Sequence, residues 1–353
     1  MRDITSYNIE KLVSLIGKAG KIAVVSHMKP DGDALGSCLG MSSYLKACGK
    51  EFVKIVLPDK APSYLDFLIA NGTSKDIIIH DDKPSQAEAA IKESDLIICL
   101  DFNAFHRTDA LEQILSESEA TKILIDHHLN PDREKFSLSF SETEISSASE
   151  LVYQILMRTP SIDGHAVRLP QSCAMALMTG MTTDTNNFAN SVYPSTLRMA
   201  SDLLEAGIDR AFILSSLYNQ YSETRMRLMG HVLKDLMTIT SDGVAYIVLD
   251  KKVLQEYHIE EGDTEGFVNL PLSMAKVKMS LLLKEDGNKV RVSIRSKKGI
   301  SANRCSRLHF NGGGHENAAG GRLYIPEDIA GIEEIAQYVE RHTHTFMTEE
   351  NEE

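Results

Sequence analysis

The sequence predicts an α/β protein, in which a mainly parallel sheet with helices on both faces is followed by a helical connector and a smaller α/β domain. Two observations predict this order. Strand-like and helix-like segments alternate over residues 1–190, and such alternation is typical of a parallel sheet covered by helices. From Gly243 onwards, apolar residues recur at every second position instead, which indicates strands with one buried face. A chain of 353 residues has room for two such domains.

Five short apolar runs in the first domain are predicted to be strands, because β-branched and other apolar residues dominate them. A helix is predicted from Asp33, which we place at the N-cap, to Cys48, where Gly49 ends it. A second helix is predicted over Ser147–Met157, where apolar residues recur at helical spacing. The predicted strands are 21–26, 52–57, 76–79, 96–100 and 122–125.

Residues 191–237 are predicted to be helical and to connect the two domains. One helix ends at Gly207, and a longer one rich in Met and Leu is predicted over 209–237. Packing against the chain's own domains explains this apolar surface as well as packing against a second copy, so a homodimer stays open. The predicted domains are 1–190 (catalytic), 191–237 (connector) and 238–345 (substrate-binding), with a disordered acidic tail at 346–353.

The second domain begins with a predicted hairpin, since alternating apolar residues flank the turn Glu285–Asn288, which contains Asp-Gly. A glycine-rich segment, Asn311–His315, follows it. Glycine lets backbone N–H groups approach an anion closely, and Arg295 at the end of the hairpin is able to hold a phosphate by two hydrogen bonds. A glycine run alone is usually only a loop. Lys297, Lys298, Arg304 and Arg307 add local positive charge, although a solvated basic face explains these four equally well.

Composition narrows the class of protein. The net charge of −13 disfavours a protein that grips long nucleic acid, and favours a small phosphate compound bound by local positive charge. No apolar run is long enough for a membrane span, and the N-terminus lacks the apolar core of a signal peptide. The five cysteines are scattered without a CxxC pair, which is typical of reduced thiols. These features predict a cytoplasmic protein with no membrane partner.

Side chains that bind metals or transfer protons follow three of the predicted strands. His27, Asp31 and Asp33 come after the first strand, Asp101 comes directly after the fourth, and Asp126-His127-His128 follows the fifth. Because the carboxyl ends of parallel strands meet at one edge of a sheet, we expect these side chains to converge there. Such a mixture of carboxylates and imidazoles suits Mn²⁺, Mg²⁺, Fe²⁺ or Zn²⁺.

Asp101, which stands alone at the end of its strand, is the natural carboxylate to bridge two ions. His127 would then join the second ion, and Asp184 would complete that site. Taken singly, each of these residues is explained as well by a turn, a helix cap or a surface position. Their joint placement at successive strand ends is what favours a metal site.

These motifs resemble those of a known family, the DHH phosphoesterases. The four ordered motifs are His27-x-x-Pro30-Asp31-Gly32-Asp33, Asp101, Asp126-His127-His128 and Thr183-Asp184-Thr185. In the second domain, Arg295-Ser296 and Gly312-Gly313-Gly314-His315 resemble the DHHA1 domain of the same enzymes. The resemblance covers nearly the whole chain. By size and layout it is greatest to the nanoRNase type, an oligoribonuclease that also acts on 3′-phosphoadenosine 5′-phosphate (pAp).

The resemblance implies a role for each residue, with two divalent ions as cofactors, Mn²⁺ in the first place and Mg²⁺ as the alternative. The expected ligands are His27, Asp31 and Asp101 for one ion, and Asp33, Asp101, His127 and Asp184 for the other. His128 is expected to face the scissile phosphate, Asp126 to orient an imidazole, and Asp101 to be essential for catalysis. Arg295, Ser296, Gly313, Gly314 and His315 are expected to bind a phosphate or base of the substrate.

The function that follows is hydrolysis of short RNA or DNA oligonucleotides to mononucleotides, with pAp as a further substrate. Cleavage of linear or cyclic dinucleotides in signalling needs the same metal site and stays open. A RecJ-like exonuclease is disfavoured because the chain has no room for the extra nucleic-acid-binding domains of that branch. A manganese pyrophosphatase lacks the glycine–histidine segment, and a non-enzymatic nucleotide sensor would not need every ligand.

Overall fold

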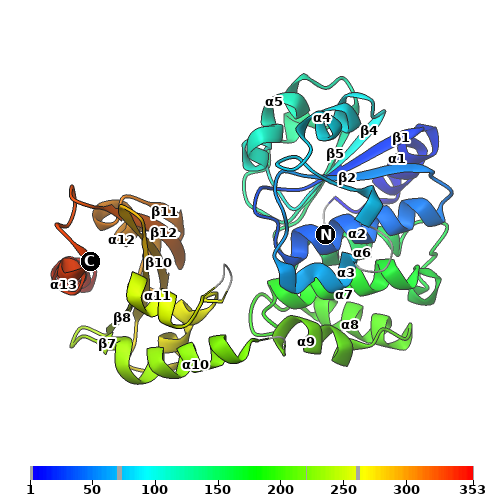
Figure 1. The fold of residues 1–353 in the computed structure, drawn as a ribbon. Helices are drawn as coiled ribbons and strands as arrows, with labels where there is room; N and C mark the ends of the chain where they lie inside the picture. The colour runs from blue at the N-terminus through cyan, green and yellow to red at the C-terminus, as the bar shows by residue number, and fades with distance from the viewer. Residues whose placement is uncertain (1–2, 70–73, 220, 260–262, 353) are drawn as a thin grey trace. The chain divides into compact units, whose positions relative to one another are not determined.

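The computed structural model describes residues 3–69, 74–219, 221–259 and 263–352 (Figure 1). The chain divides into two compact units, Met1–Gln220 and Tyr221–Glu353, and each unit has its own sheet and apolar core. The division falls inside the segment 191–237 that the sequence predicts to be a connector. Among the described residues, no helix is both long and apolar enough to cross a membrane.

The first unit is built on a parallel sheet of six strands in the order β3-β2-β1-β4-β5-β6. The predicted α/β class is therefore confirmed. The sixth strand was not predicted, because its four residues alternate with serine and are too short to stand out. The strands are β1 (Lys21–Val25), β2 (Phe52–Leu57), β3 (Ile77–Ile79), β4 (Leu96–Leu100), β5 (Thr121–Asp126) and β6 (Leu138–Ser141).

Helices cover both faces of this sheet, on opposite sides of it in Figure 1. Side chains of β4 show why: Leu96, Ile98 and Leu100 enter one apolar core, whereas Ile97 and Cys99 enter the other. The first core holds α1 (Ser6–Lys18), α2 (Gly32–Ala47), α3 (Asp66–Ile69), α6 (Ala148–Leu156), α7 (Gln171–Asp184), α8 (Pro194–Glu205) and α9 (Arg210–Tyr218), and the second holds α4 (Pro84–Lys92) and α5 (Glu112–Glu117).

Helices α2 and α7 lie unusually close together because glycines line their contact. A Cβ atom on Gly36 would lie 2.6 Å from the carbonyl oxygen of Ala176, and one on Gly32 would overlap the side chain of Thr183. Only glycine permits this approach. The contact sets the first turn of α2 beside the last turn of α7, so that Asp33 and Asp184 become neighbours.

Two helix predictions need correction. Asp31, not Asp33, is the N-cap of α2, since its Oδ1 accepts hydrogen bonds from the backbone N–H of Asp33 and of Ala34. The single long helix predicted over 209–237 is wrong: α9 ends at Tyr218, and α10 (Glu223–His231) begins afresh after its N-cap Ser222. Val232–Leu236 then forms a π-turn, and Met237 starts a strand.

The second unit has a mixed sheet in the order β11-β12-β10-β9-β8-β7, in which only β8 and β9 are parallel. The predicted hairpin is present, because β9 and β10 pair with Asp286 opposite Lys289. One face packs on α12 (Ala302–His309) and α13 (Ile335–Glu352), and the other on α10 and α11 (Lys251–Glu256). The strands are β7 (Met237–Ile239), β8 (Val244–Leu249), β9 (Met279–Asp286), β10 (Lys289–Ser296), β11 (Gly313–His315) and β12 (Ala318–Tyr324).

The acidic end of the chain differs from its prediction. Helix α13 continues to Glu352, where the sequence predicts a disordered tail from 346 onwards. Phe346 and Met347 are buried in the core of the second unit, and this apolar pair holds the helix against the sheet. Because the last residues are mostly acidic, composition alone did not predict that this pair would be buried.

Candidate metal centre

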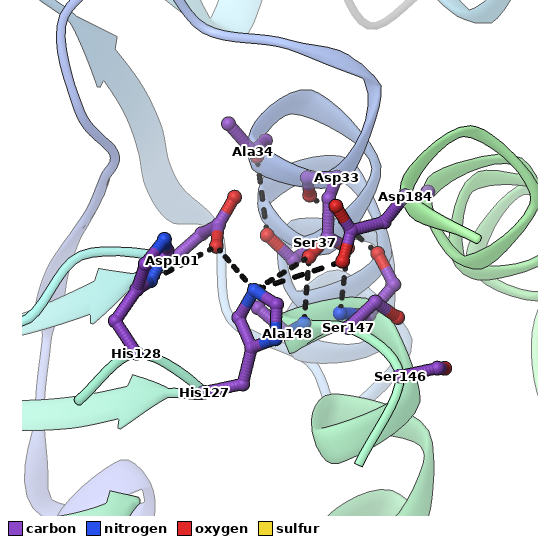
Figure 2. A network of polar contacts seen from close by, with 12 residues as sticks. Asp33, Ala34, Ser37, Asp101, His127, His128, Ser146, Ser147, Ala148 and Asp184 are labelled. Atoms are coloured by element: carbon purple, nitrogen blue, oxygen red, sulfur yellow. Dashed lines mark hydrogen bonds and ion pairs between the residues drawn. The ribbon is translucent and has the colours of Figure 1, made fainter. Parts of the chain in front are cut away.

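The sheet places three groups of polar side chains at one edge. The strand order reverses between β1 and β4, since the chain runs outward from β1 to β3 and then returns to β4 beside β1. Such a reversal opens a crevice at the carboxyl ends of the strands. His27 follows β1, Asp101 follows β4, and His127 and His128 follow β5, so all four stand at this crevice. Figure 2 shows how Asp101 and the two histidines of β5 face the helix ends that carry Asp33 and Asp184.

Asp101 lies between two histidines from different strands. Its Oδ2 is 3.4 Å from Nε2 of His27, and its Oδ1 is 3.4 Å from Nε2 of His127. The side chain is buried, and Oδ1 makes no hydrogen bond within the described residues. Its backbone has a φ of +63°, a left-handed conformation that non-glycine residues adopt at a cost and that is common at functional sites. A buried carboxylate with an unused oxygen and two opposed imidazoles fits a position between two cations.

Three overlapping groups of side chains present donor atoms that lie within 4.8 Å of one another. They bring together all six residues that the sequence predicts as metal ligands, so the donor set fits the divalent ions that the resemblance implies. Carboxylate oxygens mixed with imidazole nitrogens suit Mn²⁺, Mg²⁺, Fe²⁺ or Zn²⁺. The groups are His27, Asp31 and Asp101; Asp33, His127 and Asp184; and Asp101, His127 and His128.

Hydrogen bonds to Nδ1 hold two of the imidazoles in place. Nδ1 of His27 lies 2.8 Å from the carbonyl oxygen of Met28, which leaves Nε2 for Asp101. Nδ1 of His128 lies 2.7 Å from Oδ1 of Asp126, and the backbone N–H of His128 donates to Oδ2 of the same carboxylate. Asp126 is fully buried. It therefore orients His128, as carboxylates behind metal-site histidines commonly do.

Asp33 is anchored by a helix other than its own. Its Oδ2 accepts a hydrogen bond from the backbone N–H of Ala148 at 2.6 Å, and its Oδ1 accepts one from the N–H of Ser149 at 2.8 Å. Both donors belong to the first turn of α6, where N–H groups have no partner within the helix. Oδ2 of Asp33 also lies 3.9 Å from Nε2 of His127, which in turn is 3.7 Å from Oδ2 of Asp184.

The crowding of acids sets the protonation of the site. Burial is the largest single cause and favours neutral imidazoles, but Asp101 and the neighbouring carboxylates together outweigh it and raise the pKa of His27 to about 9 and that of His127 to about 10. Burial, together with the charge of Asp101, raises the pKa of Asp184 to about 6. The two imidazoles hold the pKa of Asp101 below its usual range despite its burial. Protons thus balance the acids here, and a bound cation would displace them.

The residues predicted to bind substrate gather at one end of three strands in the second unit. Arg295 on β10 and His315 on β11 both pair with Ala318 of the strand between them. Among the described residues, the Arg295 guanidinium donates to the carbonyl oxygens of Ile294 and Ala319, and burial lowers its pKa. It contacts no carboxylate within the described residues.

Two of the groups that are predicted to bind substrate already make hydrogen bonds within the protein. The hydroxyl of Ser296 is buried, donates to the carbonyl oxygen of Ile300 and accepts from Asn317. The backbone N–H of Gly314 donates to Oδ1 of Asn303, and a Cβ atom at Gly314 would lie 2.5 Å from the carbonyl oxygen of Ala318. Close packing of β11 therefore explains a glycine at this position without any ligand.

The sequence interpretation missed Glu150, the buried acid at the start of α6. The signal was present, since Ser147 followed three residues later by Glu150 matches the capping-box pattern. The helix itself was predicted, but nothing in the sequence shows that its N-terminus would meet Asp33.

Comparison with known proteins agrees with this geometry. The model of the "DHH family, N-terminal domain" matches residues 21–181, and that of the "DHHA1 domain" matches residues 230–341. The chain is 31% identical to a Thermus thermophilus "Bifunctional oligoribonuclease and PAP phosphatase NrnA", over 89% of this chain and 88% of that protein. It is 30% identical to a "Cyclic-di-AMP phosphodiesterase GdpP" of Geobacillus thermodenitrificans, over 57% of this chain but only 30% of that protein.

A solved structure shares both units. The exopolyphosphatase-related protein of Bacteroides fragilis has a TM-score of 0.89 and 36% sequence identity, with 98% of each chain covered. Together with the two matching domain models and the ordered motifs at the sheet edge, this similarity identifies the family. The chain belongs to the DHH family and carries a DHHA1 domain in its second unit.

Proposed function

We propose that this protein is a metal-dependent phosphoesterase that hydrolyses short oligonucleotides to mononucleotides and also removes a phosphate from pAp. The observation that carries the proposal is Asp101, buried between His27 and His127 with each carboxylate oxygen 3.4 Å from an imidazole nitrogen. A relative that matches over most of both chains is named as an oligoribonuclease and PAP phosphatase. The cysteines form no disulfide among the described residues, which agrees with the cytoplasmic location that we propose.

We assign the ligands from the groups of donor atoms. His27 and Asp31 would hold one ion, Asp33, His127 and Asp184 would hold the other, and Asp101 is placed to serve both. The four ligand carboxylates balance the charge of two divalent ions, so the buried cluster is close to neutral when both are bound. Two such ions supply a hydroxide near neutral pH and stabilise negative charge on a phosphate. We propose Mn²⁺ as the preferred ion, with Mg²⁺ as the alternative.

His128 acts on the substrate in this proposal. Because Asp126 accepts the Nδ1 proton of His128, Nε2 is the nitrogen left to face a phosphate oxygen. The imidazole then donates a hydrogen bond to charge that develops on the phosphate or on the leaving oxygen. The side chains of His128 and Asp184 are 25% and 31% exposed and Asp31 is exposed as well, so a substrate can reach the centre from solvent.

The second unit would bind a part of the substrate away from the scissile bond. Arg295 supports this role, because its guanidinium is half-buried and bonded to carbonyl oxygens alone within the described residues. A phosphate would supply the negative charge that it lacks. We also assign His315 and Gly313 to this subsite, on the shared end of β10 and β11.

Cleavage of cyclic dinucleotides is the second candidate. The chain matches a cyclic-di-AMP phosphodiesterase across part of its length, and that reaction needs the same ions. The match spans less than a third of that protein, whereas it spans most of the oligoribonuclease, so we rank short oligonucleotides first.

A substrate panel tests the proposal. Purified protein with Mn²⁺ is given pAp, RNAs of two, five and twenty nucleotides, a cyclic dinucleotide and pyrophosphate, and the products are separated by chromatography. We expect the dinucleotide and the pentanucleotide to be cleaved fastest, with measurable release of phosphate from pAp. Equal rates on all three RNAs would contradict the preference for short substrates, and no cleavage of any phosphoester would overturn the proposal.

A further inference from the structure

The anchor of Asp33 depends on the exact placement of the first turn of α6. Ala148 and Ser149 can donate to both oxygens of Asp33 only if their N–H groups stay parallel and fixed. Ala148 and Ser149 lie more than a hundred positions from Asp33 in the sequence, so no local backbone geometry holds them next to it. Figure 2 shows this turn directly beneath the acids of the metal centre.

Glu150 fixes that turn. Its backbone N–H donates to the N-cap hydroxyl of Ser147 at 2.9 Å. One carboxylate oxygen, Oε2, accepts hydrogen bonds from the backbone N–H of Ser146 at 3.2 Å, from the Ser146 hydroxyl at 2.5 Å and from the hydroxyl of Thr196 at 2.7 Å. The arrangement resembles a capping box, except that the acid reaches the residue before the N-cap. Thr196 lies in α8, so Glu150 ties the start of α6 to a second helix.

Glu150 is costly as a purely structural residue. The side chain is completely buried, and its other oxygen, Oε1, has no hydrogen-bond partner within the described residues. Burying a carboxylate with half of its acceptors unused opposes folding. A negative charge is nevertheless favoured at the N-terminus of a helix, and here the same N-terminus holds Asp33.

We propose that Glu150 is a positioning residue of the metal centre. Its carboxylate holds the first turn of α6 in place, and the turn in turn holds Asp33 in the orientation of a metal ligand. Residues that orient ligands in this way are commonly needed for metal affinity. This inference rests on the proposed function, because it assumes that Asp33 binds a divalent ion.

The variant Glu150→Gln tests the inference. Glutamine keeps the size of the side chain, but it removes the charge and sets an NH₂ group where Oε1 has no partner. We expect the variant to bind Mn²⁺ about 10- to 100-fold more weakly than the wild type at one of two sites, measured by calorimetric titration of metal-free protein. The melting temperature of the metal-free variant is expected to stay within a few degrees of the wild type.

Tyr153→Phe is the matched control. Tyr153 also lies on α6 and ties it to α8, because its hydroxyl donates to Asp202 at 2.6 Å, but it stands one turn beyond Glu150 and makes no contact with Asp33 that the described residues show. We expect its Mn²⁺ affinity to equal that of the wild type. If Tyr153→Phe weakens Mn²⁺ binding as much as Glu150→Gln does, general loosening of α6 is the cause and the inference is wrong.

Two further results complete the test. If Glu150→Gln does not fold, Ser146→Ala is measured in its place, because it removes one of the three hydrogen bonds that the Glu150 carboxylate accepts. Unchanged Mn²⁺ affinity in Ser146→Ala would overturn the inference. Unchanged affinity in a folded Glu150→Gln would do the same. Wild-type protein that binds no Mn²⁺ at all would instead overturn the proposed function, so the two failures can be told apart.

Discussion

The close contact of α2 and α7 makes a prediction about both stability and metal binding. In Gly36→Ala, the new methyl group would lie 2.6 Å from the carbonyl oxygen of Ala176 and 3.0 Å from the backbone of Gly180. These are backbone atoms, which cannot rotate away as a side chain can. Alanine favours the helix by about 0.5–1 kcal/mol over glycine, but overpacking of a core costs about 1–3 kcal/mol. The free energy of unfolding of the variant should therefore be about 1–2 kcal/mol lower than that of the wild type.

The assay is thermal unfolding of metal-free protein, followed by Mn²⁺ titration. A loss of this size lowers the melting temperature of a unit of about 200 residues by about 3–6 °C. Moving α2 away from α7 also separates Asp33 from Asp184, so Mn²⁺ affinity should fall as well. Gly17→Ala is the control, because Gly17 lies in α1 with no atom within 4 Å of the added methyl. If Gly36→Ala is as stable as Gly17→Ala, the packing argument is refuted.

Three other predictions concern separate parts of the chain. Asp126→Asn should lower kcat about 10- to 100-fold with little change in KM, because His128 loses its orienting carboxylate; steady-state kinetics at saturating Mn²⁺ would show this, and an unchanged kcat would refute it. Arg295→Lys should raise KM for pAp more than it lowers kcat, since lysine cannot form two parallel bonds to a phosphate; equal kinetics would exclude Arg295 from the subsite. Burial lowers the pKa of His309 and His342, so the unfolded chain binds protons at a higher pH than the folded one, and the second unit should lose stability as pH falls below about 6.5. Urea unfolding at pH 7.5 and at pH 5.5 measures this loss of stability, and the loss should be smaller in His342→Phe.

Hydrophobic periodicity was enough to predict the first sheet. Four of its strands are largely buried apolar runs and β3 is a half-buried run of three isoleucines, so all five stand out in the sequence. The acids and histidines that follow β1, β4 and β5 converge because the strands are parallel. The sixth strand forms only by pairing with β5, through Leu138 and Phe140, and its own residues carry no comparable signal.

Where the sequence misled, a contact between distant residues decided the outcome. Asp31 and Asp33 both fit the pattern of an N-cap, but Asp33 turns away from its own helix because α6 offers it two N–H groups. Met237–Ile239 fits a helical pattern as well as a strand, and pairing with β8 makes it a strand. Ser296 stays a predicted substrate residue: its hydroxyl bonds to Asn317 and to the carbonyl oxygen of Ile300, contacts that periodicity along β10 alone does not reveal.

The central claim is that Asp101 joins two ions in one centre, and Mn²⁺ binding by Asp101→Asn tests it most directly. Asparagine keeps the size of the side chain and tolerates the left-handed backbone at this position, so the fold should survive. We predict that the wild type binds two Mn²⁺ ions whose electron paramagnetic resonance spectrum shows spin coupling. In Asp101→Asn, the coupling and the turnover of short RNA should be lost together. A variant that still binds two coupled ions and cleaves RNA at the wild-type rate would contradict the account.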